Sequence, residues 1–436
     1  MIAYSIRVAI HSLRHNVPLT MLICAAVAVG IAGCMSTYTI YYAMSGDPIA
    51  WKSSQLFTPQ VDAWGPGKRE KNEEPSDQLT YQDAIGLAPS HIPLRQAAMF
   101  HTRLTFAPQD SNQAPFIVSG RATSSEFFRM FDVPFRAGGP WTAADEEGRA
   151  SVVVLGAKVA DRLFPGRSAI GATVTLNEHA YRIVGVLEDW NPQPRFYDVG
   201  GTALADSEDM FLPFKTAIER EVPATGPMAC QTDPEPGTGW QGLLNSDCTW
   251  IQFWVELPNG ADVIRYRKFL TDYASEQRSN GRFNWAPLTR LRNVREWLAY
   301  RHVVSDELRA ITLISFAFLL VCLVNAVGLM LAKFTSRDSE LAVRRSLGAS
   351  RFHIFVQCLC AAGAIGAVGG IVGWIGTFLG VAAERAILPG PIARLAQMDI
   401  YLTTITLILA IFATVLAGLY PAWRVSRVQP ARALRA

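Results

Sequence analysis

The sequence has few charged residues and none of the common hydrolase motifs. Charged residues make up 18% of the 436 positions, whereas an average soluble domain has roughly 25%. No HExxH or CxxC pattern is present to hold a zinc ion, and no GxSxG turn is present to expose a nucleophilic serine. These absences argue against a metallohydrolase and a serine hydrolase. We therefore expect a non-catalytic chain that binds no metal or cofactor of its own.

A phosphate-binding P-loop is also missing. That motif needs glycines whose backbone amides surround a phosphate, followed by a lysine and a hydroxyl residue. Gly166 and Gly171 have the required spacing and Thr173 supplies a hydroxyl, but Ala172 stands where the motif needs its lysine. The chain is therefore not expected to hydrolyse ATP itself.

What the sequence does contain is four long apolar runs. A membrane helix needs about 20 mostly apolar residues to cross the hydrocarbon core. Runs of this length lie at 18–43, 311–332, 353–382 and 400–420, and the second span together with its preceding stalk is expected at 306–332. The first could be a signal peptide, but it is longer than a signal core and no small-residue cleavage pattern follows it. We therefore expect four transmembrane helices, with the first retained as an anchor.

Positive charge is concentrated in three stretches beside these runs. Residues 1–17, 333–353 and 421–436 together carry a net charge of +9, which leaves −6 for the rest of a chain with net charge +3. Lys and Arg near the ends of spans mark the cytoplasmic side of a membrane. Both termini and the loop 333–352 are therefore expected in the cytoplasm, with 383–399 as a short loop on the other side. The basic residues are Arg7, Arg14, Lys333, Arg337, Arg344, Arg345, Arg351, Arg424, Arg427, Arg432 and Arg435.

The polar stretch 44–305, between the first and second spans, is long enough for a folded domain. Short β-prone runs alternate in it with short helical patterns, which predicts an α+β domain outside the cytoplasm. The proline-rich part at about 190–250 is interpreted as an inserted subdomain or extended loop. Residues 291–310 are expected to form a stalk helix that continues into the second span. Strands are expected at 116–119, 151–155, 173–176, 181–186 and 251–255, a hairpin turn within 176–181, and helices at 124–131 and 157–164.

Of the seven cysteines, only Cys230 and Cys248 fall in this external domain. The other five lie in or beside the spans, where a thiol behaves as a small apolar group. Outside the cytoplasm, two cysteines of one domain are candidates for a disulfide. The alternative is a pair of free thiols.

The third span is rich in glycines with GxxxG spacing. Small residues four apart allow two helix backbones to approach closely in lipid. One interpretation is tight packing within the subunit, and the other is a dimer interface. The residues are Gly366, Gly369, Gly370, Gly373, Gly376 and Gly380.

The loop between the second and third spans has the pattern of a short amphipathic helix. Leu341, Arg344 and Arg345 recur at helical spacing. Gly348 is expected to end this helix and Ser350 to cap the third span. The loop could equally be a positively charged anchor that contacts no partner.

This loop and the basic tail resemble those of a known family. Glu340, Arg344, Arg345 and the run Leu347-Gly348-Ala349-Ser350-Arg351 are similar to the loop of MacB/FtsX/LolC/LolE permeases, the mechanotransmission or type VII ABC systems. The opening stretch 6–14 and the tail from Pro421 to Arg435 also resemble that family. Stretches 118–139, 151–155, 160–164, 169–171 and 181–186 look like the MacB periplasmic core.

The resemblance implies a fold, a mechanism and partners. The fold is membrane α-helical with a large α+β periplasmic domain inserted between helices 1 and 2, in the bacterial inner membrane. A MacB- or LolD-type ATPase dimer, which carries ATP and Mg²⁺, is expected to contact the loop. The chain starts shortly before its first span, so that ATPase is expected on a separate chain. The substrate is handled on the periplasmic side, and no span has an internal charge that would mark a polar path. The expected contact residues are Glu340, Arg344, Arg345, Leu347, Gly348 and Arg351.

Several functions are compatible with this family. The first is export with a periplasmic adaptor and an outer-membrane channel. The alternatives are lipoprotein extraction of the LolC/LolE kind and FtsX-like signalling to a cell-wall hydrolase; a membrane enzyme is a remote fourth. With four spans in one chain, a second permease chain is expected, identical or paralogous. Lipid surrounds the spans, and no nucleic-acid partner is expected.

Overall fold

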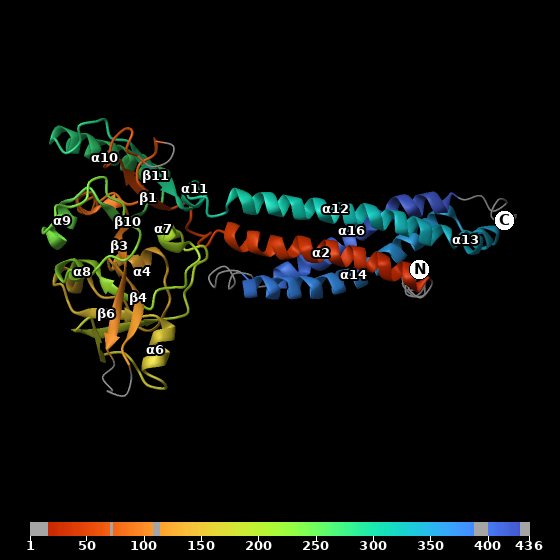
Figure 1. Ribbon diagram of the computed structural model, residues 1–436, viewed down its shortest axis with the longest axis horizontal. Coiled ribbons are helices and arrows are strands. Elements are labelled where there is room, and N and C mark those ends of the chain that lie inside the picture. The colour runs from red at the N-terminus through yellow and green to blue at the C-terminus, as the bar shows by residue number, and fades with distance from the viewer. Residues whose placement is uncertain (1–15, 70–72, 108–113, 388–399, 428–436) are drawn as a thin grey trace. The chain divides into compact units, whose positions relative to one another are not determined.

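The computed structural model describes residues 16–69, 73–107, 114–387 and 400–427 of a chain that forms two compact units (Figure 1). We call Met1–Ser45 with Val304–Ala436 the membrane unit, and Gly46–Val303 the inserted domain. The opening stretch 6–14, most of the loop 383–399 and the end of the tail lie outside the described residues. The predicted fold class is confirmed: four apolar helices, with an α+β domain between the first and the second.

The four long helices of the membrane unit can each cross a bilayer. They have 27 or more residues, and a rise of about 1.5 Å per residue makes them longer than the roughly 30 Å hydrocarbon core. Ile23, Val27, Met330, Ile365 and Ala410 belong to their shared apolar core. The helices are α2 (Val17–Ser45), α12 (Asp306–Thr335), α14 (Arg351–Ile387) and α16 (Ile400–Ser426), and the shorter α13 (Asp338–Ser346) lies between α12 and α14 in the chain.

The helix α16 continues past the end expected at residue 420. Pro421 lies inside the helix, which runs to Ser426. Proline has no N–H group, so it removes one backbone hydrogen bond. Membrane helices tolerate this because packing and local adjustment satisfy the freed backbone group. Here Ala422 and Val425 are buried in the bundle core, which keeps this extra turn in place.

The stalk prediction was wrong, because the chain is not one helix from 291 to 310. Residues 289–293 form a strand, and α11 (Val294–Tyr300) is a separate short helix that begins with an Asn293–Glu296 capping box. His302 then has a left-handed backbone with φ of 47°. A new helix starts where the Ser305 side chain accepts a hydrogen bond from the Leu308 amide. The chain therefore forms two separate helices, each with its own N-terminal cap: the Asn293–Glu296 capping box of α11 and the Ser305 cap of α12.

The inserted domain is built on a large mixed sheet. Its strand order is β11-β1-β10-β3-β4-β9-β6-β8-β5, with β2 paired to β10. Because β7 pairs with both β3 and β8, the strands β3, β4, β9, β6, β8 and β7 form a closed ring. The strands are β1 (Leu56–Val61), β2 (Leu79–Thr80), β3 (Arg95–Ala107), β4 (Phe116–Thr123), β5 (Phe135–Gly138), β6 (Val152–Leu155), β7 (Thr173–Leu176), β8 (His179–Leu187), β9 (Met210–Pro213), β10 (Thr249–Glu256) and β11 (Thr289–Asn293).

Both faces of the sheet are buried along β6, β9 and β10, whose residues are all buried. Alternate residues of a strand point to opposite faces. Accordingly, Val153 and Leu155 belong to one apolar cluster, while Val152 and Val154 belong to another. This explains why the strands read as continuous apolar runs in the sequence. The helices of the domain are α3 (Tyr81–Leu87), α4 (Glu126–Met130), α5 (Ala143–Glu147), α6 (Ala157–Leu163), α7 (Val199–Thr202), α8 (Phe214–Glu219), α9 (Gly239–Asn245), α10 (Gly260–Ser279) and the 3-10 turn η2 (Phe196–Asp198).

Residues 190–250 do not form a separate subdomain. The strand β9 lies inside the sheet, paired with β4 on one side and β6 on the other. Its four residues are all buried. The prolines of this region mark turns on either side of β9, and they concealed a short central strand.

The hairpin turn predicted within residues 176–181 is confirmed, and it is shorter than that stretch. Leu176 of β7 pairs with His179 of β8, which leaves a two-residue turn. Both turn residues, Asn177 and Glu178, have positive φ angles of 43° and 69°. This is the backbone of a type I′ turn, which strongly favours Asn-Gly. The Asn177 side chain also accepts a hydrogen bond from the Thr105 amide of β3 at 2.7 Å.

We predict that Glu178→Gly stabilises the inserted domain. Glycine removes the steric cost of the left-handed backbone, a gain of about 0.5–1 kcal/mol. Thermal unfolding of the full chain in detergent, followed by tryptophan fluorescence, should shift upward by about 2–4 °C. The control is Arg267→Gly at an exposed position in the middle of α10, which should lower the midpoint. A fall in the Glu178→Gly midpoint would contradict this account of the turn.

Candidate functional site

The helix α13 is held against the membrane bundle by its apolar face. Leu341 is buried in the same cluster as Phe334 and Ile354, and Ala342 beside it is also buried. Large apolar groups are exposed just after α13, at the residue that follows it and at the second residue of α14. Leu347 is 83% exposed and Phe352 is 74% exposed. These two residues therefore offer apolar surface that the described residues do not cover.

Charged side chains flank the exposed apolar groups. Glu340 accepts from Arg344 one turn later at 2.7 Å and lies 3.4 Å from Arg337. Arg351 is exposed, whereas Arg344 and Arg345 are partly buried. All six residues predicted to contact an ATPase thus lie on or beside α13, at 340–351. No described contact tests the prediction itself.

The run Leu347-Gly348-Ala349-Ser350 is a compact joint between two helices. Gly348 has φ of 100°, and its amide donates to the Arg345 carbonyl at 3.1 Å. The Ala349 amide donates to the Arg344 carbonyl at 3.1 Å, which completes a Schellman cap. Ser350 then accepts from the His353 amide at 3.2 Å at the start of α14. Glycine and serine occupy the positions where such a joint needs them, as predicted.

The glycines of α14 allow two neighbouring helices of the same chain to approach closely. Gly370 faces α16, where an added Cβ would lie 2.6 Å from the Ala410 Cβ. Gly373 faces α2, where an added Cβ would lie 3.1 Å from Ile31. Gly366 shares the first contact, and Gly369, Gly376 and Gly380 share the second. Of the two interpretations left open by the sequence, the structure shows packing within the subunit.

Polar contacts join α2 and α12 at one end of the bundle. Asn16 donates to the Ser336 hydroxyl at 2.9 Å, and the Lys333 ammonium donates to the Thr20 hydroxyl. Lys333 was expected in a loop, but it is only 1% exposed inside the last turn of α12. The helix therefore runs past the span end expected at residue 332, and it carries this charge in its last turn.

The inserted domain contains a buried network of charges. The Arg121 side chain of β4 is fully buried and donates to Glu208 at 2.7 Å and to Asp198 at 2.5 Å. Arg195 also donates to Glu208, at 3.2 Å. Burial alone would raise the pKa of Asp198 and of Glu208, but the two guanidinium groups outweigh it and lower both pKa values. The network is therefore charged and internally balanced.

His101 of β3 lies beside this network. Its Nδ1 is 3.0 Å from the Thr225 hydroxyl, and its Nε2 is 2.9 Å from the Ser119 hydroxyl. Burial and the nearby Arg121 cation lower the pKa of His101 to about 4. A neutral imidazole is thus fixed between two hydroxyl groups.

Sequence reasoning missed this charged network. Arg121 donates to residues 77 and 87 positions away in the chain. The one available signal was a lone arginine inside an apolar strand, between Gly120 and Ala122. An arginine buried there requires a carboxylate partner, but the strand does not indicate which one.

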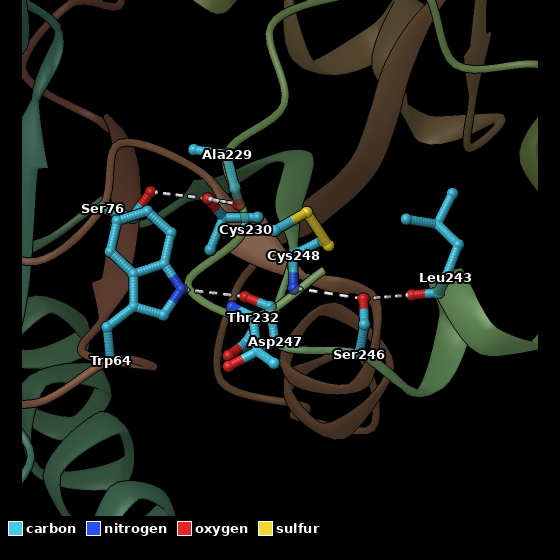
Figure 2. The surroundings of a disulfide bond; sticks show 10 residues. Trp64, Ser76, Ala229, Cys230, Thr232, Leu243, Ser246, Asp247 and Cys248 are labelled. Atoms are coloured by element: carbon cyan, nitrogen blue, oxygen red, sulfur yellow. Dashed lines mark hydrogen bonds between the residues drawn. A yellow bond between two sulfur atoms is a disulfide. The ribbon is translucent and has the colours of Figure 1, made fainter. Parts of the chain in front are cut away.

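The cysteines of the inserted domain are joined by a disulfide between Cys230 and Cys248 (Figure 2). The bond lies beside a two-way backbone pairing, in which the Thr249 amide donates to Ala229 at 2.8 Å and the Ala229 amide donates to Thr249 at 3.2 Å. In the chain-entropy model, closing a loop of this size contributes about 3 kcal/mol. The disulfide therefore fixes the segment around Ala229 to the start of β10. Among the described residues, no three His, Cys, Asp or Glu side chains lie close enough to hold a metal ion.

We predict that Gly370→Ala destabilises the membrane unit. The added methyl group would overlap Ala410 and force α14 and α16 apart, and overpacking of this kind costs about 1–3 kcal/mol. The control is Gly328→Ala in α12, where an added Cβ meets nothing within 4 Å. The readout is the fraction of protein that stays monodisperse in detergent after heating. If both variants lose the same fraction of monodisperse protein, the close approach of α14 and α16 does not contribute to stability as proposed.

We also predict that stability falls with acid through His101. Its folded pKa of about 4 lies below its ordinary value of 6.5. Between these values the unfolded chain binds a proton that the folded chain does not, so the free energy of unfolding decreases as the pH falls from 6.5 to 4. His101→Gln should reduce this slope in fluorescence-detected unfolding. His179→Gln, an exposed histidine of β8, should keep the wild-type slope; an unchanged slope in both variants would contradict the prediction.

Two family models match the chain. One, described as the MacB-like periplasmic core domain, matches residues 20–272. The other, described as the FtsX-like permease C-terminal, matches residues 312–430. Together they match most of the chain and both of its units.

Curated relatives include proteins named macrolide export ATP-binding/permease protein MacB. Those of Rhodopirellula baltica and Escherichia coli strain K12 are each 24% identical over 99% of this chain, and that of Azoarcus sp. is 25% identical over 98%. The chain spans 62%, 60% and 58% of their respective lengths. Each relative is thus longer than this sequence.

The comparison with solved structures includes the periplasmic region of MacB from Actinobacillus actinomycetemcomitans. It has a TM-score of 0.37 and 15% identity, and the match covers 59% of this chain and 96% of that one. The extracellular domain of the Gram-positive transporter YknZ has a TM-score of 0.33 and 13% identity, and the match covers 54% and 99% of the two chains. Because the MacB-like model alone covers more than half of the residues and the FtsX-like model follows it, the chain belongs to the MacB/FtsX family of ABC-transporter permease components.

Proposed function

We propose that this chain is a non-catalytic permease subunit that receives mechanical work from a separate ATPase through α13. The observation that carries the proposal is the exposed apolar surface of Leu347 and Phe352 beside the arginines of the same segment. Large exposed apolar groups with a polar rim mark protein contact sites. An ATPase dimer of the MacB or LolD type would cover this surface.

The joint between α13 and α14 supports transmission of force. Only residues 347–350 separate the two helices, and their backbone is held by the Schellman cap and the Ser350 cap. Leu341 and Ala342 keep α13 on the bundle. A displacement of α13 would therefore move α14 as well, because no flexible loop separates the two helices.

The glycine contacts extend this path through the membrane unit. α14 touches α2 along one glycine row and α16 along the other. α2 and α12 are the helices whose chain leads into and out of the inserted domain. A shift of α14 would thus reach both chain connections of that domain.

We infer that the transport direction is export. The named relatives are macrolide exporters, and the basic loop and tail favour a cytoplasmic position for both. The inserted domain would then lie in the periplasm of a bacterial inner membrane and work with an adaptor and an outer-membrane channel. A second permease chain, identical or paralogous, would complete the complex. FtsX-like signalling and lipoprotein extraction are the alternative functions, and identification of the partner protein would distinguish between them.

We predict that Leu347→Asp breaks the complex with the ATPase. A buried anchor of an interface contributes 2 kcal/mol or more, so its loss should weaken association on the order of 30-fold. The double variant Arg344→Glu and Arg345→Glu should act in the same direction. The measurements are co-purification of a P-loop ATPase in mild detergent, identified by mass spectrometry, and the ATP turnover of that complex.

The matched control is Ile264→Asp, which replaces another exposed apolar residue on α10 of the inserted domain. It should leave the ATPase bound and active. If the α13 variants also leave the ATPase bound and its turnover unchanged, the segment is only a charged anchor at the membrane surface, and the proposal is wrong.

A further inference from the structure

The inserted domain has a cleft of about 240 Å³ whose floor is polar. Segments distant in the sequence meet there, including β1, β10, the residues before β2, and α11. The floor is formed by Thr58, Ser76, Gln78, Thr249 and Gln252. All five side chains are buried and none carries a charge. Such a floor offers hydroxyl and amide groups rather than ions.

Part of the hydrogen-bonding capacity of this floor is unused. The Ser76 and Thr249 hydroxyls lie 2.8 Å apart and bond to each other. Gln78 is only 9% exposed, and its side-chain nitrogen has no hydrogen-bond partner among the described residues. A buried amide donor without a partner is costly. A bound molecule with an acceptor would satisfy it.

The charged groups of the walls are in ion pairs, and one oxygen of Asp77, Oδ1, is a buried acceptor without a hydrogen-bond partner among the described residues. Asp77 forms an ion pair with Arg301. Asp198 accepts from Arg121 at 2.5 Å and from Gln252 at 3.3 Å. A charged ligand would lose its water without gaining an unpaired opposite charge, which is unfavourable. The cleft therefore favours an uncharged molecule.

The size and the rim of the cleft narrow the ligand class further. A water molecule has about 30 Å³ of liquid volume, so the cleft holds the volume of about eight waters, or roughly one sugar ring. Its rim includes the apolar residues Val199, Pro227 and Met228. An amphipathic ring with hydroxyl groups on its edge and C–H groups on its face fits this combination. We propose that the cleft binds an uncharged, hydroxyl- and amide-bearing sugar ring, such as a neutral N-acetylhexosamine.

The disulfide holds one side of the rim in place. Ala229 follows Met228 and pairs in both directions with Thr249 of the floor. Figure 2 shows Ser76, Ala229 and the Cys230–Cys248 bond in the same region. Because the bond joins the residues next to that pair, the rim cannot swing away from the floor. Reduction of the disulfide should therefore weaken sugar binding.

The experiment measures binding of N-acetylglucosamine to the full chain in lipid nanodiscs, without sugar-based detergent. Saturation-transfer NMR and calorimetry provide the readouts. For a molecule of about fifteen non-hydrogen atoms, the usual binding energy per atom gives a Kd on the order of 1 mM. Glucosamine and glucuronic acid have the same ring with a positive or a negative charge, and both should bind at least tenfold more weakly.

Variants locate the site and test the role of the disulfide. Val199→Trp should fill the mouth of the cleft and abolish binding. Ile117→Trp, at an exposed position of β4 that does not line the cleft, should bind normally. The double variant Cys230→Ser and Cys248→Ser should raise the Kd several-fold.

The outcomes decide the proposal independently of the ATPase complex, since it concerns the inserted domain alone. Tighter binding of the disaccharide N,N′-diacetylchitobiose would support the same site and identify the end of a glycan as the source of the ring. The proposal is overturned by the absence of saturable binding well above the expected Kd. It is equally overturned if a charged analogue binds as tightly, or if Val199→Trp binds normally.

Discussion

The close backbone approach of α14 to its two neighbours is the contact on which the membrane unit depends. In lipid, water does not drive apolar helices together, so association relies on close packing and on hydrogen bonds between helices. The glycines at 366 and 370 supply that packing toward α16, and those at 369, 373, 376 and 380 supply it toward α2. The polar contacts of Lys333 and Asn16 then join α2 to α12. α13 has a fixed position because the bundle beneath it is held in this way.

In the inserted domain, the main constraint is the burial of the central strands β6, β9 and β10, which are buried on both faces. A fully buried arginine is tolerated at Arg121 because two carboxylates neutralise it. Removal of one member of a buried ion pair typically costs 3–5 kcal/mol, since the remaining charge is left without a partner. Arg121 therefore couples β4 to the segment around residues 195–208. The same segment lines the cleft, so the charged network also supports its wall.

The sequence predicted what is encoded locally. Apolar length located the four spans, and the Gly348 and Ser350 positions located the joint between α13 and α14 because helix caps depend on nearby residues alone. The sequence did not predict the features that depend on contacts between residues distant in the chain. β9 is a strand only because β4 and β6 pair with it, and Arg121 is stable only because Asp198 and Glu208 reach it. The break after Tyr300 was missed because it contains no proline or glycine; a left-handed His302 and the Ser305 cap produce it.

That break determines which kinds of movement can pass along the chain between α12 and α11. The ladder of backbone hydrogen bonds that makes a helix stiff in torsion does not continue from α11 into α12, because the amides of residues 301–303 bond back to carbonyls of α11 and α12 begins with the Ser305 cap. Rotation of α12 about its own axis can therefore be absorbed by a few φ and ψ angles. Displacement along the axis cannot be absorbed in this way once the short connection is extended, because five residues reach at most about 18 Å. Under the proposed function, this connection would therefore pass tension from α12 to the inserted domain more faithfully than torque.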